Sequence, residues 1–414
     1  MGVAFIMAEP VEGALAARSG NRCGAPFVPC EGAEFARDPA SAPAADAVLA
    51  ARPVYDEPFA PVVGRFAPSP TGRMHLGNIM ASLLAWLSVR SQGGKLILRI
   101  EDLDDRARSG PWADLLMDDL RWLGLHWDEG PYYQTGRLDL YEAALTQLED
   151  LGLLYPCFCT RAELHAASAP HASDGTPIYV GTCRGLTPEE VAERSKLRPP
   201  ALRLRVPAVR TAPRSAANIR ESLLSRAKLP DSADFLPREL TLAGYGTPPV
   251  RNDAGPIRFE DRTYGPQQEV LAQECGDFLV RRSDGVFAYQ LAVVVDDAAM
   301  GVTEVVRGCD LLGSTARQLY LQDLLGYEHP EYAHVPLLVA PDGRRLSKRD
   351  RDLDMGELRA RFDTPEALLG KLACAVGLRC DAAPCSAERL VEGFTWDWVR
   401  EHPGDIVVAP GFLG

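Results

Sequence analysis

The sequence of 414 residues lacks a long hydrophobic run, has few cysteines and carries no overall excess of positive charge. Its apolar stretches, such as 291–295, are far shorter than the roughly 20 residues that a membrane-spanning helix needs, which argues against an integral membrane protein. Ten cysteines are too sparse for a disulfide scaffold. The first residues also lack the basic region of a cleavable signal. These absences predict a protein of a reducing, cytoplasmic compartment with no membrane partner.

The charge balance at first argues against a nucleic-acid partner, because 44 basic residues face 57 acidic ones and the formal charge is −13. One segment departs from this balance. Between Lys196 and Lys228, nine basic residues face one acid, Glu221. Such a stretch can neutralise phosphates even on an acidic protein, whereas a solvated insertion is the alternative interpretation.

The N-terminal part of the chain divides into an irregular extension and a regular segment. Residues 1–60 are rich in alanine, proline and glycine, which predicts a flexible extension. In residues 61–155, a short strand at 62–68, a turn, a helix with spaced apolar residues and a buried strand at 95–100 follow one another. This alternation predicts an α/β fold with a parallel sheet.

The α/β pattern is interrupted in residues 156–275, where cysteines, prolines and irregular sequence predominate. Regular signals return in residues 276–355. There, DFLVRRSDGVFAYQLAVVVDD predicts two strands joined by a Ser-Asp-Gly turn, and VTEVVRG follows as a further regular segment. Residues 356–414 can hold a small helical piece. A segment that interrupts a parallel sheet is interpreted as an inserted domain.

One motif predicts a nucleotide site. It is RFAPSPTGRMHLGN, from Arg65 to Asn78, in which a strand leads through a turn stiffened by proline and glycine into a helix. Free backbone N–H groups and the helix dipole favour a phosphate at such a place. His75 adds a donor there, and Gly77 allows a nucleotide to approach the backbone. A lone histidine would suit an ordinary strand-to-helix turn, but the whole string favours the nucleotide site.

A basic loop at residues 343–350, GRRLSKRD, complements this motif. A glycine before a dense basic run with a serine suits a mobile loop that closes on a polyphosphate. Lys348 would then stabilise charge on the transferring phosphorus. Taken alone, the run favours a solvated turn, whereas its pairing with the upstream motif favours the phosphate role.

Five strings in the order RFAPSPTGRMHLGN, LRIEDLD, FAYQLAVVVDD, VVRGCDLL and RRLSKRD together resemble the catalytic core of class I glutamyl-tRNA synthetases. The resemblance covers about residues 62–205 and 263–380. It implies a Rossmann-like catalytic domain with its first half at 61–155 and its second half at 276–355. An insertion at 156–275 with a zinc-binding module and a short helical subdomain at 356–414 complete the expected architecture.

Within this group the sequence is most similar to the glutamyl-queuosine tRNA(Asp) synthetases, which are shortened relatives without an anticodon-binding domain. The stretch after Lys348 is too short for the anticodon-reading region of a full synthetase. Residues 78–81, Asn-Ile-Met-Ala, lack the Ala-Arg pair common in full synthetases. Residues 349–350 read Arg-Asp where many full enzymes have Arg-His.

The resemblance also implies the substrate-binding residues. A dicarboxylate that carries one ammonium needs a guanidinium and a carboxylate, and Arg307 offers a bidentate fork. Glu101 follows a strand at the edge where open sheets bind ligands, and can take the α-ammonium. His75 and Lys348 are the expected catalytic residues. The implied glutamate-binding residues are Arg65, Phe66, Ala67, Pro68, Ser69, Glu101, Tyr289 and Arg307, and the implied ATP-binding residues are His75, Gly77, Asn78, Ser347 and Lys348.

A cysteine-rich pattern in the insertion predicts a metal site. Cys157 and Cys159 are followed by Tyr179 and Cys183, and thiolates are ligands that suit tetrahedral zinc. The spacing alone leaves buried reduced cysteines as an alternative, whereas the resemblance implies one structural Zn²⁺ per chain with these four ligands. The long loop before Tyr179 contains His165 and His171, which are candidate substitute ligands.

The resemblance implies a reaction in two steps. Glutamate attacks the α-phosphate of Mg-ATP while His75 and Lys348 offset phosphate charge, and the acyl group then passes to a hydroxyl of queuosine at the wobble position of tRNA(Asp). Such chemistry rests on positioning and electrostatics. The alternatives are a truncated synthetase that charges tRNA(Glu), a smaller nucleotidyltransferase, and a non-catalytic tRNA- or adenylate-binding module. A monomer is expected.

Overall fold

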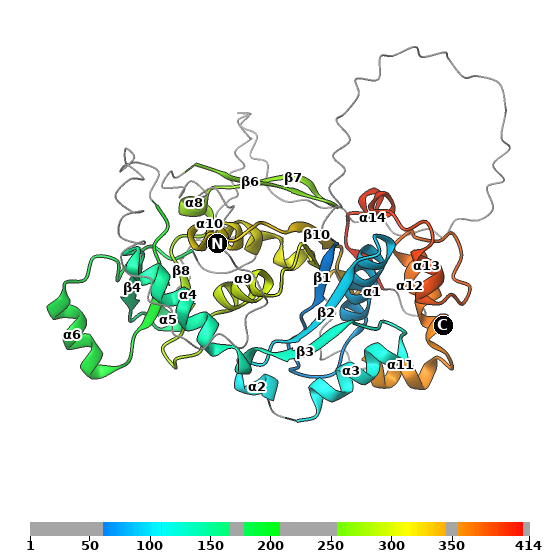
Figure 1. The fold of residues 1–414 in the computed structure, drawn as a ribbon, viewed down its shortest axis with the longest axis horizontal. Helices are drawn as coiled ribbons and strands as arrows, with labels where there is room; N and C mark the ends of the chain where they lie inside the picture. The colour runs from blue at the N-terminus through cyan, green and yellow to red at the C-terminus, as the bar shows by residue number, and fades with distance from the viewer. Residues whose placement is uncertain (1–60, 109, 165–177, 208–254, 345–353, 409–414) are drawn as a thin grey trace, which may run out of the picture.

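The fold is built on a parallel sheet that begins at the N-terminal end of the described residues. The computed structural model describes residues 61–108, 110–164, 178–207, 255–344 and 354–408. The strands β1 (Val63–Phe66), β2 (Lys95–Ile100) and β3 (Glu129–Tyr133) are parallel neighbours in that order. The helix α1 (Leu76–Ser91) crosses from β1 to β2, and α3 (Trp112–Trp122) from β2 to β3 (Figure 1). The predicted parallel sheet is therefore confirmed.

A second set of strands continues this sheet on the other side of β1. Its order is β7 (Gly265–Glu269), β6 (Ile257–Asp261), β10 (Glu331–Val335) and β9 (Glu304–Gly308), with β6, β10 and β9 parallel. The strand β9 lies beside β1, because the N–H of Thr303 donates to the carbonyl of Val63 at 2.8 Å. The central order is thus β3-β2-β1-β9-β10. The first strands are added on one side of β1 and the later strands on its other side, as in Rossmann-like folds.

Helices cover this sheet and enclose two hydrophobic cores. The helix α1 and the C-terminal helices share one core, and α4 (Leu138–Asp150), α9 (Tyr289–Ala299) and α10 (Thr315–Leu325) share the other. Both cores stabilise the fold, since the burial of apolar surface contributes about 25 cal/mol per Å². Short elements complete this part of the chain: α2 (Asp105–Arg108), η1 (Gln134–Gly136), α8 (Leu271–Glu274) and η2 (Cys309–Ser314).

The strand pair predicted for residues 277–297 is wrong in its second half. The strand β8 (Phe278–Arg281) and the turn are present, but only an isolated bridge between Arg281 and Phe287 follows before α9 begins at Tyr289. Residues 291–295 are all buried within this helix. A short run of β-branched residues suits a strand and a fully buried helix equally, so tertiary packing decides between them.

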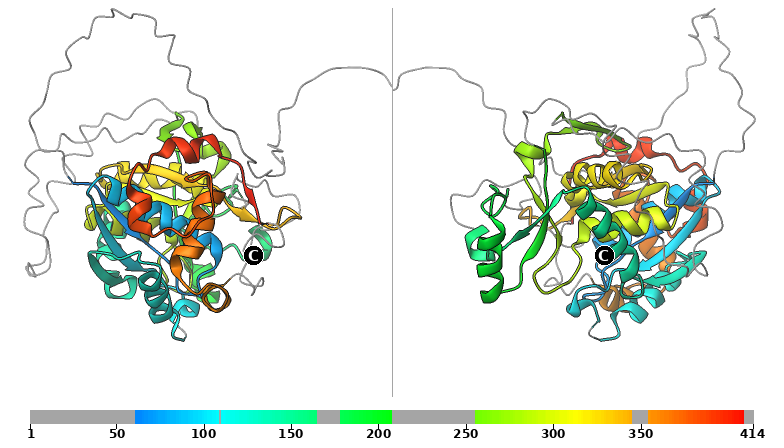
Figure 2. Two further views of the ribbon diagram at one scale, coloured as in Figure 1. Left: turned by 90° about the vertical axis from the view of Figure 1, so that its right-hand side faces the viewer. Right: turned by 60° about the vertical axis from the view of Figure 1, so that its left-hand side comes forward.

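The interrupting segment forms a small antiparallel sheet at one end of the molecule. Its strands β4 (Leu154–Cys157) and β5 (Ala201–Leu204) pair with each other, and β5 also pairs with β8. The helices α5 (Arg161–Leu164) and α6 (Pro188–Leu197) belong to the same unit, and α6 has no buried residue. Figures 1 and 2 show this unit projecting from the main body.

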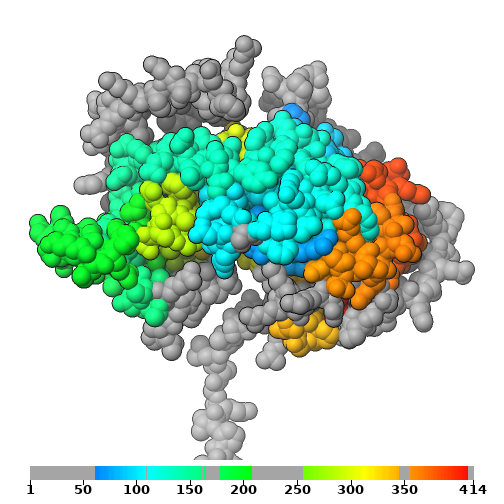
Figure 3. Space-filling view, turned by 90° about the horizontal axis from the view of Figure 1, so that it is seen from below, coloured from blue at the N-terminus to red at the C-terminus, as the bar shows by residue number. Residues whose placement is uncertain are grey.

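The C-terminal residues form short helices that pack against α1. Trp396, for example, donates its indole N–H to Ser88 of α1 at 3.0 Å. Figure 3 shows part of this region at the end of the molecule opposite α6. Among the described residues no helix is long and apolar enough to cross a membrane. The elements are α11 (Met355–Arg361), α12 (Pro365–Ala375), α13 (Ala387–Val391), α14 (Trp396–Glu401) and the parallel pair β11 (Leu338–Val339) and β12 (Ile406–Val407).

Candidate active site

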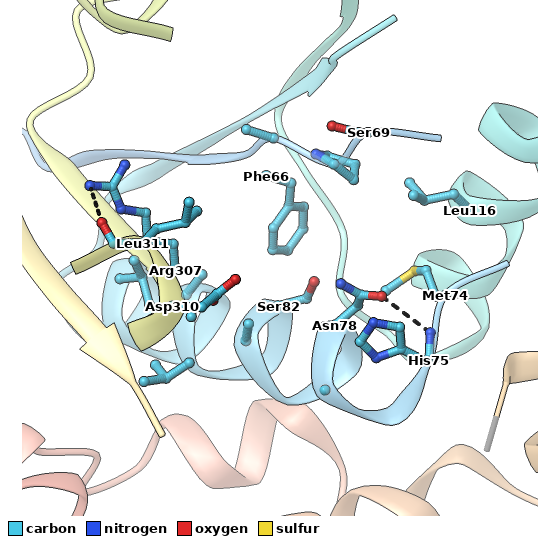
Figure 4. Close-up of a pocket in the computed structure, with 18 of the residues that line it drawn as sticks. Phe66, Ser69, Met74, His75, Asn78, Ser82, Leu116, Arg307, Asp310 and Leu311 are labelled. Atoms are coloured by element: carbon cyan, nitrogen blue, oxygen red, sulfur yellow. Dashed lines mark hydrogen bonds between the residues drawn. The ribbon is translucent and has the colours of Figure 1, made fainter. Parts of the chain in front are cut away.

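A pocket of about 470 Å³ opens at the carboxyl end of the central strands. The loop after β1, the start of α1 and residues of β9 form its walls. It lies where β1 separates β2 from β9, which is the place at which open α/β sheets bind ligands. Figure 4 shows Arg307 on one side of this pocket, His75 and Asn78 on the other, and Phe66 between them.

The structure brings most of the predicted site residues together in this pocket. All eight residues predicted for glutamate line it, namely Arg65, Phe66, Ala67, Pro68, Ser69, Glu101, Tyr289 and Arg307. His75, Gly77 and Asn78 line it as well. Ser347 and Lys348 lie outside the described residues, so the structure does not place them. The sequence strings that come from four distant parts of the chain therefore converge on one cavity.

Arg65 is a buried cation with donors available to a ligand. Its Nη1 donates to the carbonyl of Val306 at 3.1 Å, and its Nε lies 3.6 Å from Asp297 Oδ1. No other hydrogen bond of this guanidinium is made to the described residues, so Nη2 and one N–H of Nη1 remain for a ligand. Burial lowers the pKa of Arg65, although the charge of Asp297 opposes this effect. The side chain stays cationic at neutral pH, because guanidinium groups do not deprotonate in proteins.

Arg307 is buried and almost fully engaged by the protein. Its Nε donates to His334 Nε2 at 3.0 Å and its Nη1 to Gln318 Oε1 at 2.7 Å. Its Nη2 donates to the carbonyl of Leu311 at 3.3 Å and to Thr315 Oγ1 at 2.9 Å. Four of the five N–H groups thus have partners among the described residues. One N–H of Arg307 thus lacks a partner among the described residues, whereas the bidentate contact predicted for Arg307 needs two.

Glu101 is a buried carboxylate of the pocket, which Asp310 also lines. Its carboxylate accepts from Arg99 Nη2 at 3.2 Å and from Ser69 Oγ at 3.4 Å. Burial raises the pKa of Glu101, against the opposing charges of Arg99 and Arg65. Glu101 is 8% exposed, so its carboxylate is buried rather than solvated. Tyr289, by contrast, is 36% exposed and reaches the pocket from the first turn of α9.

Arg99 pairs with three buried carboxylates at the pocket, those of Asp297, Glu101 and Asp296. The sequence analysis assigned no role to Arg99. It is fully buried on β2, donates to Asp297 Oδ1 at 2.6 Å, and lies 3.6 Å from Asp296 Oδ2. Burial would lower the pKa of Arg99, but the charges of Asp297, Glu101 and Asp296 outweigh burial and raise it. A single arginine inside an apolar strand, KLILRI, is the signal that could have revealed this ion cluster.

The start of α1 presents polar groups toward the other end of the pocket. His75 precedes the first helical turn, and its backbone N–H donates to Asn78 Oδ1 at 3.2 Å. A Cβ atom at Gly77 would lie 3.2 Å from the His75 ring, so glycine keeps this approach open. His75 also forms an isolated backbone bridge with Asp354, and the N–H of Met355 donates to the carbonyl of Met74 at 2.9 Å. Asp354 and Met355, which follow the basic loop, are therefore hydrogen-bonded to the motif that contains His75.

The predicted metal ligands also meet in space, at the tip of the antiparallel sheet. One sulfur atom each of Cys157, Cys159 and Cys183 lie within 4.8 Å of one another. Cys159 and Cys183 are 3.7 Å apart, and the Tyr179 hydroxyl lies 3.5 Å from Cys157 and 3.6 Å from Cys159. His165 and His171 lie outside the described residues. This cluster could hold a metal ion.

The size of the cluster fits zinc. Zn–S bonds of about 2.3 Å and Zn–O bonds of about 2.0 Å in a tetrahedron place two sulfurs about 3.8 Å apart and a sulfur and an oxygen about 3.5 Å apart. The buried Arg203 adds positive charge, since its Nε donates to Cys157 at 3.3 Å and its guanidinium lies 3.7 Å from the centre of the Tyr179 ring. Burial raises the pKa of Cys157, but hydrogen bonds from Tyr179 and Arg203 outweigh this effect and lower it.

Comparison with known families identifies similar proteins. The family model of the class I tRNA synthetases (E and Q), catalytic domain, matches residues 61–225 and 250–392. A protein of Nitratidesulfovibrio vulgaris named glutamyl-Q tRNA(Asp) synthetase is 45% identical over 332 residues, which cover 78% of this chain and 88% of the relative. A protein of the same name from Symbiobacterium thermophilum is 44% identical, with 82% and 94% covered.

Two further relatives carry a different name. Glutamate–tRNA ligase 2 of Alkalilimnicola ehrlichii is 41% identical over 319 residues, which cover 75% of this chain and 57% of that protein. The crystal structure of a glutamate tRNA ligase from Elizabethkingia meningosepticum in complex with its amino acid superposes with a TM-score of 0.64 at 24% identity. That superposition covers 86% of this chain and 68% of that one, and supports the likeness of fold.

Proposed function

Since the chain belongs to the class I tRNA synthetases (E and Q), and within them to the glutamyl-Q tRNA(Asp) synthetases, we propose that it activates L-glutamate with ATP and transfers it to queuosine in tRNA(Asp). The observation that carries the first step is the charge pattern of the pocket. Two buried guanidinium groups, of Arg65 and Arg307, face the same cavity as the Glu101 carboxylate. A ligand with two carboxylates and one ammonium matches this pattern.

Each charged group has a proposed place on the amino acid. Arg65 has the most free donors and binds one carboxylate through two N–H groups. Arg307 attracts the other carboxylate with its remaining N–H. Glu101 accepts from the ammonium, which replaces part of the contact with Arg99. Phe66, Ala67, Pro68, Ser69 and Tyr289 form the surrounding wall.

The start of α1 is the proposed place of the ATP phosphates. Free N–H groups at a helix N-terminus bind anions, and His75, Gly77 and Asn78 lie there. Ser347 and Lys348 complete this site in the proposal, and Mg²⁺ enters with ATP. The carboxylate of glutamate attacks the α-phosphorus, and the pyrophosphate leaves with its charge offset by His75 and Lys348. No covalent bond to the protein forms in this step.

The second step transfers the activated acyl group. A hydroxyl of queuosine at the wobble position of tRNA(Asp) attacks the carbonyl of glutamyl-adenylate and releases AMP. In the basic stretch that begins at Lys196, Arg203 is buried against Cys157 and Arg205 lies over the Tyr155 ring, so these two are engaged within the protein. The other basic residues of the stretch, part of which lies outside the described residues, have contact with tRNA phosphates as their proposed role. Charging of tRNA(Glu) is the second candidate, because relatives named glutamate–tRNA ligase also match the chain.

Assays with defined tRNAs separate these functions. ATP–pyrophosphate exchange should depend on L-glutamate and proceed without tRNA. Radiolabelled glutamate should then attach to tRNA(Asp) that contains queuosine, and neither to tRNA(Asp) that lacks it nor to tRNA(Glu). Labelling of tRNA(Glu) would instead establish the ligase function, and the absence of any glutamate-dependent exchange would leave only a binding function.

We further propose that Cys157, Cys159, Tyr179 and Cys183 hold one structural Zn²⁺ per chain. Three thiolates and a phenolate would give the loaded site a charge of about −2, and the adjacent Arg203 offsets part of it. The ion would hold β4 to the segment that contains Tyr179 and Cys183, because the ligands come from both. The site is remote from the pocket in sequence and supplies no group to the proposed chemistry.

Replacement of Arg203 by methionine is expected to weaken zinc binding by about 10- to 100-fold, which is the usual effect of losing a group that contacts the metal ligands. Competition of the purified protein with a chromogenic chelator measures this affinity. Arg205→Met is the matched control, since the Arg205 guanidinium lies over the Tyr155 ring and donates to the carbonyl of Arg184 instead of to a cysteine. Equal zinc affinity of the two variants, or wild-type protein without zinc after expression in zinc medium, would contradict the proposal.

A further inference from the structure

We propose that Asp261 and His334 are positioning residues that set the orientation of Arg307 and thereby the affinity for glutamate. This inference rests on the proposed function of the pocket. Neither residue lines the pocket, and both are fully or almost fully buried, with His334 at 0% and Asp261 at 1% exposure. They reach the ligand only through Arg307.

The three residues form a continuous chain across neighbouring strands. Arg307 on β9 and His334 on β10 are partners in the parallel register, and Asp261 ends the next strand, β6. His334 Nδ1 lies 2.6 Å from Asp261 Oδ2, and His334 Nε2 lies 3.0 Å from Arg307 Nε. The chain therefore runs from Asp261 at β6, across the sheet, to the guanidinium that faces the pocket.

The chemistry of the chain defines one tautomer of His334. Arg307 Nε can only donate, so His334 Nε2 must carry the lone pair and Nδ1 must carry the proton. That proton is donated to Asp261, which holds the ring in place. The groups that face the imidazole are Asp261, Arg307, the Thr315 hydroxyl at 3.5 Å from Nε2, the stacked Tyr332 ring and, at longer range, Arg65. Burial and the Arg307 charge lower the pKa of His334 to about 4, against the effect of Asp261, so the ring is neutral at neutral pH.

The anchor of this chain is itself immobile. Asp261 Oδ1 accepts from the backbone N–H groups of Thr263 and Tyr264, each at 3.0 Å, and the N–H of His334 is shared between Oδ1 at 3.3 Å and Oδ2 at 3.2 Å. Its Oδ2 also accepts from the imidazole, at the shorter distance of 2.6 Å. On the other side of Arg307, Gln318 accepts from Nη1 and is held by Gln290 at 2.9 Å. Arg307 is thus held from both sides. These contacts fix the orientation of its guanidinium and therefore the direction of its one remaining N–H.

The substitution Asp261→Asn tests the chain directly. The amide oxygen would stay with the backbone N–H groups of Thr263 and Tyr264, so the amide nitrogen would take the place of Oδ2 and donate to His334 Nδ1. The imidazole proton would then move to Nε2 and face the Arg307 N–H, placing two donors against each other. We expect the KM for glutamate in ATP–pyrophosphate exchange to rise about 10- to 100-fold, as when a buried polar group loses its partner. The KM for ATP should stay within about twofold.

A second pair of variants covers the case in which Asp261→Asn does not fold. His334→Gln can present an amide oxygen to Arg307, whereas His334→Leu of similar size cannot. We expect His334→Gln to retain most of the glutamate affinity that His334→Leu loses. The matched control is Asp323→Asn, because Asp323 belongs to an exposed pair with His329 at 2.8 Å, and its glutamate KM should not change.

A spectroscopic measurement tests the chain independently of activity. The ¹⁵N shifts of the seven histidines should include one neutral ring protonated at Nδ1 in the wild type, assigned by its loss in His334→Leu. A wild-type His334 protonated at Nε2 would overturn the inference. So would an unchanged glutamate KM in both Asp261→Asn and His334→Leu, or an equal rise of the KM for glutamate and for ATP. If the wild type shows no glutamate-dependent exchange, the proposed function fails, while the tautomer still decides whether this chain exists.

Discussion

Replacement of Arg65 by methionine is expected to lower kcat/KM for glutamate in ATP–pyrophosphate exchange by about 100- to 1,000-fold. The variant would leave a carboxylate of the substrate in a buried pocket without its guanidinium, and breaking a buried charge pair costs about 2–5 kcal/mol. Methionine keeps much of the volume of the side chain. The loss should therefore reflect charge and hydrogen bonding more than a cavity.

Two companion variants make this result specific. Arg65→Lys retains the charge but not the planar fork, so an intermediate loss is expected. Lys95→Met removes a cation from the neighbouring strand β2, where Lys95 pairs with the exposed Glu129 at 2.8 Å, and should leave glutamate activation unchanged. The proposed glutamate site would be refuted by Arg65→Met protein that activates glutamate like the wild type. A rise of the KM for ATP by the same factor would also speak against it.

The variant Arg99→Met is expected to destabilise the fold by about 3–5 kcal/mol, because breaking a buried ion pair leaves uncompensated charge in the interior. Arg99 is fully buried and compensates Asp297, Glu101 and Asp296, which are all buried as well. Arg65 and Arg137 contact two of these carboxylates, but neither replaces the central guanidinium. Urea unfolding followed by circular dichroism measures the change in the free energy of unfolding.

The same control, Lys95→Met, shows whether the loss of stability comes from breaking a buried ion pair or from losing any positive charge on β2. Both residues lie on β2 and both pair with carboxylates, but the Lys95 and Glu129 side chains are 40% and 44% exposed. Exposed pairs contribute about 0–1 kcal/mol, so this variant should unfold close to the wild type. Similar midpoints for Arg99→Met and Lys95→Met would show that the buried cluster does not contribute as argued.

The motif strings predicted much of the candidate site because each is local in sequence. RFAPSPTGRMHLGN contains its strand, its turn and its helix start within 14 consecutive residues, so Arg65 and His75 were identified without knowledge of the fold. The C-x-C and Y-x-x-x-C spacings likewise marked Cys157 and Tyr179 as candidates for one cluster. The role of Arg99 was missed because its main partner, Asp297, is 198 residues away.

The secondary structure of residues 289–299 shows where local information ends. Valine-rich sequence favours a strand, but the segment packs as α9 inside the second core, between neighbours that the local pattern does not reveal. The bidentate role predicted for Arg307 also depends on contacts that the local sequence does not reveal. The sequence identifies the guanidinium, whereas its donors are occupied by His334, Gln318 and Thr315 only in the folded chain.

The sequence by itself determined the parallel α/β core, because hydrophobic periodicity and turn chemistry are read within one segment. Its motif strings carried the family resemblance, and that resemblance implied the glutamate- and ATP-binding residues. Only the tertiary structure decided which of these residues have free donors and which are held by others. It brought Asp261 to His334 across 73 residues and placed both behind Arg307. Such contacts depend on strand order and register, since parallel neighbours in a sheet are set by crossover connections and not by adjacency in the chain.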